Sequence, residues 1–173
     1  MAKTSKETMK KDEMKVLDVL EQHAKENIDV LAKRCGFSHQ KISRIIKHLE
    51  EKKTIWGYTA ITDEKSKNLK HFVLMIKRSN TPFEGSFKKE LILDKLDNYH
   101  IGVKIENIYL NHGEYDGIVT FYAPSLIDAK MLVQEIFKRI GKYFDKHILL
   151  ETLVSIRKNG LKNPQIDKLV EYL

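Results

Sequence analysis

Six residues between positions 39 and 47 carry side chains that can hydrogen-bond to phosphate groups or to the edges of DNA bases. They are His39, Gln40, Lys41, Ser43, Arg44 and Lys47. Apolar residues recur among them every three or four positions, at Ile42, at Ile45 or Ile46, and at Leu49, which predicts a helix with one buried side. The polar set then occupies the opposite side, which a helix lying in the major groove of duplex DNA presents to the bases.

The residues before this segment supply a turn and a second helix. In the stretch 28–48 (IDVLAKRCGFSHQKISRIIKH), Ala32 is small enough for two helices to cross closely, and Gly36 can take the left-handed conformation that ends a helix. Ser38 suits the N-cap of the next helix, because its oxygen can accept a hydrogen bond from an unpaired backbone N–H group. These positions predict a helix-turn-helix whose second helix enters a major groove. An amphipathic helix pair with a solvated cationic face is the alternative.

Positive charge is concentrated around this segment. Residues 31–60 contain seven lysine or arginine residues and two acidic residues, a local charge of +5 out of the chain's +7. A concentrated basic patch is typical of DNA-binding proteins, because phosphate contacts supply much of their affinity. We expect base contacts from the predicted helix, with Gln40 suited to adenine and Arg44 to guanine or to a phosphate. The expected phosphate contacts are Lys33, Lys47, Lys52 and Lys53.

The composition narrows the class of protein. A chain of 173 residues with 42% apolar residues suits one ordinary domain or two small ones. No run of about 18 apolar residues is present, so no membrane span is expected, and the polar, basic N-terminus does not resemble a secretory signal. The single cysteine, Cys35, favours a reducing cytoplasm and is expected to be buried. Spacings typical of metal sites and of common enzymes are absent, so we expect no metal, no cofactor and no enzymatic activity.

The order of these patterns divides the N-terminal part of the chain. We expect a disordered tail over residues 1–11, a winged helix-turn-helix domain over 12–62 and a polar hinge over 63–70. The first helix of the domain is predicted over 12–26, and the alternating residues of 54–62 predict a strand that forms the wing. The single tryptophan, Trp56, is expected to pack on the helices, with stacking on a DNA sugar as the alternative.

Residues 71–158 alternate strand and helix patterns. The predicted order is strand, helix, two strands, helix and strand, over residues 71–78, 86–99, 103–123 (with a turn at 112–116), 125–142 and 147–158. This βαββαβ order is the ferredoxin-like arrangement, an α+β fold in which helices cover one face of the sheet. The other face also carries apolar residues, so we expect it to meet a second copy of the chain. Residues 159–173 are predicted to form a C-terminal extension with a short helix.

Three segments resemble the Lrp/AsnC family, the feast/famine regulators of bacteria and archaea. LAKRCGFSHQKISRIIKHLEE (31–51) is similar to the family's helix-turn-helix, IWGYTAITD (55–63) to its wing, and HGEYDGIVTF (112–121) to its T-G-x-Y-D turn and the strand after it. The resemblance extends over nearly all of residues 12–158, and we expect a member of archaeal type. It implies a sequence-specific transcription regulator that forms dimers or higher oligomers on pseudo-palindromic promoter sites.

The resemblance also implies roles for individual residues. Carried over by position, the residues that face DNA are Ser38, Gln40, Lys41, Ser43, Arg44 and Lys47. Gly113, Glu114, Tyr115 and Asp116 would lie in a turn that senses an amino acid or a related small metabolite, where Asp116 could hold an ammonium group. A hairpin that only satisfies its own polar groups is the alternative. Two positions depart from the family pattern, because Lys53 replaces a glycine before the wing and His112 replaces a small hydroxyl residue before the sensing glycine.

Two other functions share this architecture. Siroheme decarboxylases resemble Lrp/AsnC proteins and are the first alternative, and their chemistry uses arginine and histidine side chains of the C-terminal domain. Residues 79–156 contain one arginine, Arg139, so the carboxylates of a porphyrin would find few partners. A ligand-sensing protein that has lost DNA binding is the second alternative, and the basic face of residues 39–47 argues against it.

Overall fold

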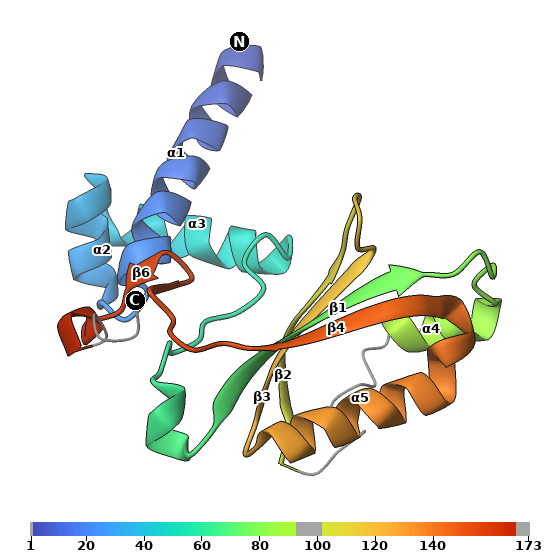
Figure 1. Ribbon diagram of the computed structural model, residues 1–173. Coiled ribbons are helices and arrows are strands. Elements are labelled where there is room, and N and C mark those ends of the chain that lie inside the picture. The colour runs from blue at the N-terminus through green and yellow to red at the C-terminus, as the bar shows by residue number, and fades with distance from the viewer. Residues whose placement is uncertain (1, 93–101, 169–173) are drawn as a thin grey trace. The chain divides into compact units, whose positions relative to one another are not determined.

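The structure, a computed structural model, describes residues 2–92 and 102–168 and divides into two compact units, Met1–Ile61 and Thr62–Leu173. The first unit consists of three helices, α1 (Ala2–His23), α2 (Ile28–Cys35) and α3 (His39–Glu51) (Figure 1). Helices α2 and α3 form the predicted helix-turn-helix. In the part of the chain that the structure describes, no helix is long and apolar enough to cross a lipid bilayer.

The ends of these helices follow from local chemistry, as the sequence predicted. The side chain of Asn27 accepts a hydrogen bond from the backbone N–H of Val30 at 3.0 Å, and Ser38 caps α3 in the same way. Gly36 ends α2 with φ +64°, in the left-handed region where a side chain is strained. After α3, Lys53 adopts φ +59°, so this lysine takes the conformation for which glycine is better suited.

A small apolar core joins the three helices. Ile42, Ile45 and Leu49 of α3 are buried against α1 and α2, and Cys35 is fully buried, as expected. The remaining buried members are Val16 and Leu20 of α1 with Leu31 and Ala32 of α2. Because the buried stripe of α3 recurs every three or four residues, it orients the helix and leaves the opposite side in solvent.

Three predictions for the first unit differ from the structure. Helix α1 begins at Ala2, so the segment predicted to be disordered over 1–11 is helical from Ala2 onward. Two features of its sequence favour a helix: it contains no glycine or proline, and Glu7 is spaced four residues from both Lys3 and Lys11. Residues 54–62 form no strand, because the described part of this unit offers no second strand for pairing. Trp56 is 96% exposed, so it does not pack on the helices.

The second unit begins with the segment predicted as a hinge. Residues Glu64–Lys67 form a short 3-10 helix, η1, which Asn68 ends with φ +52°. The carboxylate of Glu64 pairs with the ammonium group of Lys158, near the end of the chain. The 63–70 segment is therefore ordered within the second unit, because its polar side chains find partners there that a sequence pattern does not reveal.

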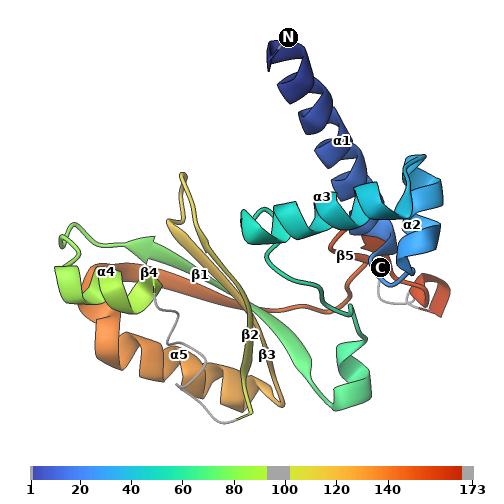
Figure 2. The same cartoon turned by 180° about the vertical axis from the view of Figure 1, so that it is seen from behind.

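The body of the second unit is the predicted ferredoxin-like fold. Its elements are β1 (Lys70–Arg78), α4 (Gly85–Ile92), β2 (Lys104–Leu110), β3 (Gly117–Ala123), α5 (Leu126–Ile140) and β4 (Phe144–Glu151). The four strands form one antiparallel sheet in the order β2-β3-β1-β4. Helices α4 and α5 lie on the same face of this sheet, as both views show (Figures 1 and 2).

The two faces of the sheet differ in what covers them. Phe72, Leu74 and Ile76 of β1 point toward the helices and are buried with the apolar side of α5. The alternate residues, including Val73 and Met75, lie on the opposite face, which no described helix of this unit covers, and are only partly buried. The sheet therefore leaves a partly exposed apolar face.

The C-terminal part differs from the prediction of one strand over 147–158. Strand β4 ends at Glu151, and β5 (Arg157–Lys158) pairs with β6 (Leu161–Lys162) in a small hairpin. Asn159 and Gly160 form its turn with φ +44° and φ +82°, and an Asn-Gly pair is a strong hairpin signal that could have been recognised from the sequence. Residues 93–99 of the helix predicted over 86–99 and residues 169–173 of the predicted C-terminal helix lie outside the described residues.

Candidate nucleic-acid interface

The outer face of α3 carries most of the predicted DNA-contacting residues. Gln40, Arg44 and Lys47 are exposed and Ser43 is half-buried, while His39 is exposed in the first turn. Burial of Ile42, Ile45 and Leu49 on the opposite side orients these side chains toward solvent. The face combines amide, guanidinium, ammonium and hydroxyl donors, which are the groups that bind phosphates and base edges.

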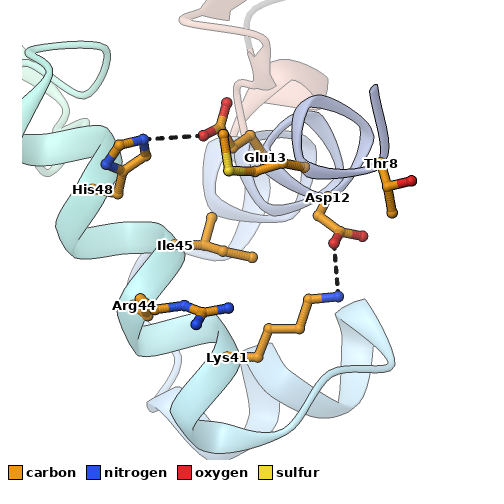
Figure 3. A pocket seen from close by; sticks show the side chains of 8 residues that line it. Thr8, Asp12, Glu13, Lys41, Arg44, Ile45 and His48 are labelled. Atoms are coloured by element: carbon orange, nitrogen blue, oxygen red, sulfur yellow. Dashed lines mark ion pairs between the residues drawn. The ribbon is translucent and has the colours of Figure 1, made fainter. Parts of the chain in front are cut away.

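The ammonium group of Lys41 is already paired with other side chains of the protein. Its Nζ lies 2.7 Å from Oδ2 of Asp12 on α1 and 3.9 Å from the centre of the Phe37 ring (Figure 3). The ion pair and the cation–π contact both compete with a phosphate for this ammonium group. Lys41 is therefore available to DNA only after it leaves Asp12.

The other lysines predicted to contact phosphates differ in whether they form ion pairs within the protein. Lys47 Nζ lies 3.9 Å from Oε1 of Glu51 in a long, exposed ion pair, and Lys52 Nζ lies 4.0 Å from Oε1 of Glu13, whose side chain is only 16% exposed. Lys33 and Lys53 are exposed and form no ion pair with any residue that the structure describes. Lys33, Lys47 and Lys53 can therefore reach a phosphate at little cost, whereas Lys52 must leave a largely buried carboxylate.

Ser38 serves the helix as well as the interface. Its Oγ accepts a hydrogen bond from the backbone N–H of Lys41 at 3.3 Å, which caps α3. A hydroxyl group has one proton to donate and two acceptor lone pairs. The proton of Ser38 thus remains for a phosphate oxygen at the N-terminal end of the helix, where the helix dipole also favours an anion.

An open groove of about 850 Å³ separates α1 from α3. Its lining consists of Thr8, Met9, Asp12, Glu13, Lys41, Arg44, Ile45 and His48. Figure 3 shows Arg44 between Lys41 and His48, with its guanidinium group directed toward α1. The carboxylates of Asp12 and Glu13 face Lys41 and His48, and among the described residues Arg44 has no ion-pair partner. Arg44 is therefore the cation of this groove that is ready to bind an external anion.

Sequence reasoning missed the carboxylates that oppose the basic face. Asp12 and Glu13 lie far from α3 in the sequence, and no spacing rule places them beside it. Arg34 is similarly occupied, because its Nε and Nη2 lie 2.6 Å and 2.7 Å from the two carboxylate oxygens of Glu26. These hydrogen bonds hold the pKa of Glu26 below its usual value. Basic residues counted from sequence thus overstate the charge that is free for DNA.

The predicted sensing turn lies at the tip of the β2–β3 hairpin. Gly113 has φ +155° and Glu114 is exposed beside it. Asp116 accepts a hydrogen bond on Oδ2 from the backbone N–H of Arg78 at 2.9 Å, and its own N–H donates to the carbonyl of Ile76. The ammonium group of Lys146 lies 5.9 Å from the centre of the Tyr115 ring. One carboxylate oxygen of Asp116 is therefore already bonded to the end of β1.

A second polar cluster, which the sequence did not indicate, lies around Glu106. The carboxylate accepts hydrogen bonds from Tyr122 at 2.6 Å and Thr120 at 3.1 Å, and it lies 3.0 Å from Nε2 of His71. Burial favours the neutral acid, but these partners outweigh it and lower the pKa of Glu106. Burial and the hydrogen bond to Glu106 raise the pKa of Tyr122. The cluster joins β1, β2 and β3, and the described residues include no group of three or more His, Cys, Asp or Glu side chains that could hold a metal ion.

Known proteins resemble the chain in sequence and in structure. No protein-family model matches the sequence. A stretch of 124 residues is 26% identical to YugG, an uncharacterized HTH-type transcriptional regulator of Bacillus subtilis, and covers 71% of this chain and 72% of that protein. The structure is similar to an AsnC family transcriptional regulator from Agrobacterium tumefaciens, with a TM-score of 0.66, 17% identity and coverage of 90% and 97% of the two chains.

A third similarity is to a transcriptional regulator from Neisseria meningitidis in complex with L-methionine. Its TM-score is 0.67 and its identity 16%, over 94% of this chain and 98% of that one. Structural similarity at such low identity concerns the arrangement of the chain, and function is carried by individual sites. The chain has the fold of these AsnC-type regulators, a helix-turn-helix unit followed by a ferredoxin-like unit.

Proposed function

We propose that the protein is a sequence-specific DNA-binding transcription regulator. The observation that supports this most strongly is the exposed outer face of α3, which carries Gln40, Arg44 and Lys47 and is oriented by the buried stripe on its other side. Arg44 has no ion-pair partner among the described residues, so its charge is free for DNA. The similarity to known regulators of transcription agrees with this proposal.

The side chains divide into those that read bases and those that bind phosphates. Gln40 can bond an adenine edge through its amide, and Arg44 can bond a guanine edge or a phosphate. Lys33, Lys47, Lys52 and Lys53, with Ser38 and His39 at the start of α3, supply phosphate contacts. Ser43 lies on the same face and bonds a base or a phosphate. Lys41 joins them when DNA displaces Asp12.

We also propose that two copies pair through the uncovered face of the sheet. Tyr109, Ile118, Met75 and Ile148 lie side by side in one row across the four strands, and Val73 and Leu150 continue the apolar surface in the next row. Tyr109 is 49% exposed although it is large and apolar. Covering this face with a second copy removes the row from water. A two-fold dimer then presents two recognition helices to a pseudo-palindromic site, with half-sites about one helical turn apart.

An amino acid or a related small metabolite is the proposed effector. The Neisseria regulator was solved with L-methionine, and Gly113, Glu114, Tyr115 and Asp116 form the corresponding candidate site here. Asp116 retains acceptor capacity for an ammonium group beyond its bond to Arg78, and Lys146 beside Tyr115 offers a charge for a carboxylate. We further propose a cytoplasmic protein of archaeal type, which the single cysteine and the lysine- and glutamate-rich composition support.

Selection of bound sequences from a random duplex pool, at two salt concentrations, tests the proposal. Enrichment of a palindrome is the expected result. Arg44→Ala should then weaken binding to the selected site by about 1–3 kcal/mol if Arg44 reads a base, while Lys138→Ala on the second unit leaves binding unchanged. Equal loss on selected and random duplexes would make Arg44 a phosphate contact. Absence of binding at both salts would contradict the proposed function.

A further inference from the structure

Helix α1 extends beyond the core of the first unit. Its buried residues are Val16 and Leu20, whereas residues 6–11 are all exposed. Residues 2–11, which we term the N-terminal arm, add about 15 Å of helix at 1.5 Å per residue. Both views show this end of α1 projecting away from α2 and α3 (Figures 1 and 2). The arm therefore contributes nothing to the apolar core.

The N-terminal arm is strongly basic. It contains four lysines, Lys3, Lys6, Lys10 and Lys11, and one acidic residue, Glu7. Lys6 and Lys10 are spaced by four residues and so lie on one side of the helix, and Lys11 follows directly. Lys6, Lys10 and Lys11 form no ion pair with the residues that the structure describes.

The carboxylates that follow the arm do not neutralise it. Asp12 is paired with Lys41, and Glu13 lies within 4.0 Å of both His48 and Lys52. Both acids are therefore compensated by cations of the helix-turn-helix. The net charge of the arm remains available to an external polyanion.

Part of the arm also borders a groove beside the recognition helix. Thr8 and Met9 of the arm line the same groove as Arg44, whose guanidinium group is directed toward α1 (Figure 3). The groove is open to solvent, so a sugar-phosphate strand adjoining Arg44 comes within reach of the long, flexible side chains of the arm.

We infer that the N-terminal arm is a second phosphate-binding element, which binds the DNA backbone next to the segment that α3 contacts. This inference rests on the proposed function, because it presupposes that α3 binds duplex DNA. The contacts are to phosphates, so the arm adds affinity without sequence preference. It extends the electrostatic footprint by up to three contacts, from Lys6, Lys10 and Lys11.

The test compares the wild type with the triple variant Lys6→Gln, Lys10→Gln and Lys11→Gln. Glutamine and lysine have similar helix propensities, so the arm keeps its helix, which circular dichroism verifies. The matched control is Lys88→Gln, Lys130→Gln and Lys138→Gln, which removes the same charge from exposed helices of the second unit. Binding is measured by fluorescence anisotropy on a selected and a random duplex between 50 and 200 mM salt.

We expect the slope of log K against log salt to fall by roughly 2 to 3 in the arm variant, at about 0.9 per lost phosphate contact. The ratio of wild-type to variant affinity then changes roughly 40-fold between the two salt limits. The loss is the same on both duplexes, and the control keeps the wild-type slope.

Other outcomes overturn the inference in recognisable ways. An unchanged slope in the arm variant shows that the arm does not touch DNA, and an equal loss in the control shows an effect of net charge alone. A change of oligomeric state on sedimentation would assign the arm to pairing with a second copy through the exposed Met9 and Met14. If the wild type itself binds no duplex, the proposed function fails and the inference fails with it.

Discussion

Replacing Asp12 by asparagine should strengthen DNA binding through Lys41. In the wild type, Lys41 must leave both the carboxylate of Asp12 at 2.7 Å and the ring of Phe37 at 3.9 Å before it can reach a phosphate. An ion pair at the protein surface contributes about 0.2–1 kcal/mol, and a cation–π contact there about 0.5–1 kcal/mol. Asp12→Asn removes the first of these costs, so binding should tighten by up to about fivefold.

Two further quantities should change with affinity in this variant. The salt slope should rise by up to about 0.9, because one more ammonium group neutralises a phosphate. The free energy of unfolding should fall by about 0.2–1 kcal/mol, because the ion pair is lost while asparagine and aspartate have similar helix propensities. Anisotropy titrations at several salt concentrations and urea unfolding measure the two effects separately.

A matched variant separates release of Lys41 from a change in net charge. Asp18→Asn removes the same charge from an exposed position of α1 that has no ion pair with the described residues. The gain in DNA affinity should be absent in Asp18→Asn and abolished in the double variant Asp12→Asn, Lys41→Gln. An equal gain in Asp18→Asn, or a gain that survives the loss of Lys41, would refute the reasoning.

Three further predictions concern stability and reactivity. Leu49→Ala should lower the free energy of unfolding by about 2–5 kcal/mol in urea, because the side chain is only 2% exposed and leaves a cavity. Cys35 should react with Ellman's reagent only upon unfolding, since burial shields the thiol and raises its pKa. The pKa of Glu106 is lowered on folding, so its contribution is present above the unfolded value of about 4.3 and is lost as the pH falls through the folded value. Glu106→Gln should therefore flatten the acid limb of the stability curve, and an unchanged limb would count against the cluster.

Local patterns in the sequence predicted most of the helices and strands of both units. The spacing of Ile42, Ile45 and Leu49 predicted which side of α3 is buried, and Ser38 and Gly36 predicted where helices begin and end, because capping depends only on neighbouring residues. Alternation in β1 likewise predicted its two faces. The Asn159–Gly160 turn followed the same kind of local rule, although it was not recognised.

Tertiary structure decided which of the candidate groups are free to act. The sequence placed Lys41 and Arg44 together on one polar face, but the packing of α1 against α3 pairs Lys41 with Asp12 and leaves Arg44 without an ion pair among the described residues. The missing wing strand has a similar cause, since a strand needs a partner that alternation alone does not supply. Spacing along one helix or strand determines which residues share a face. Which charges meet depends on how separate elements pack, and that is decided only when the whole core forms.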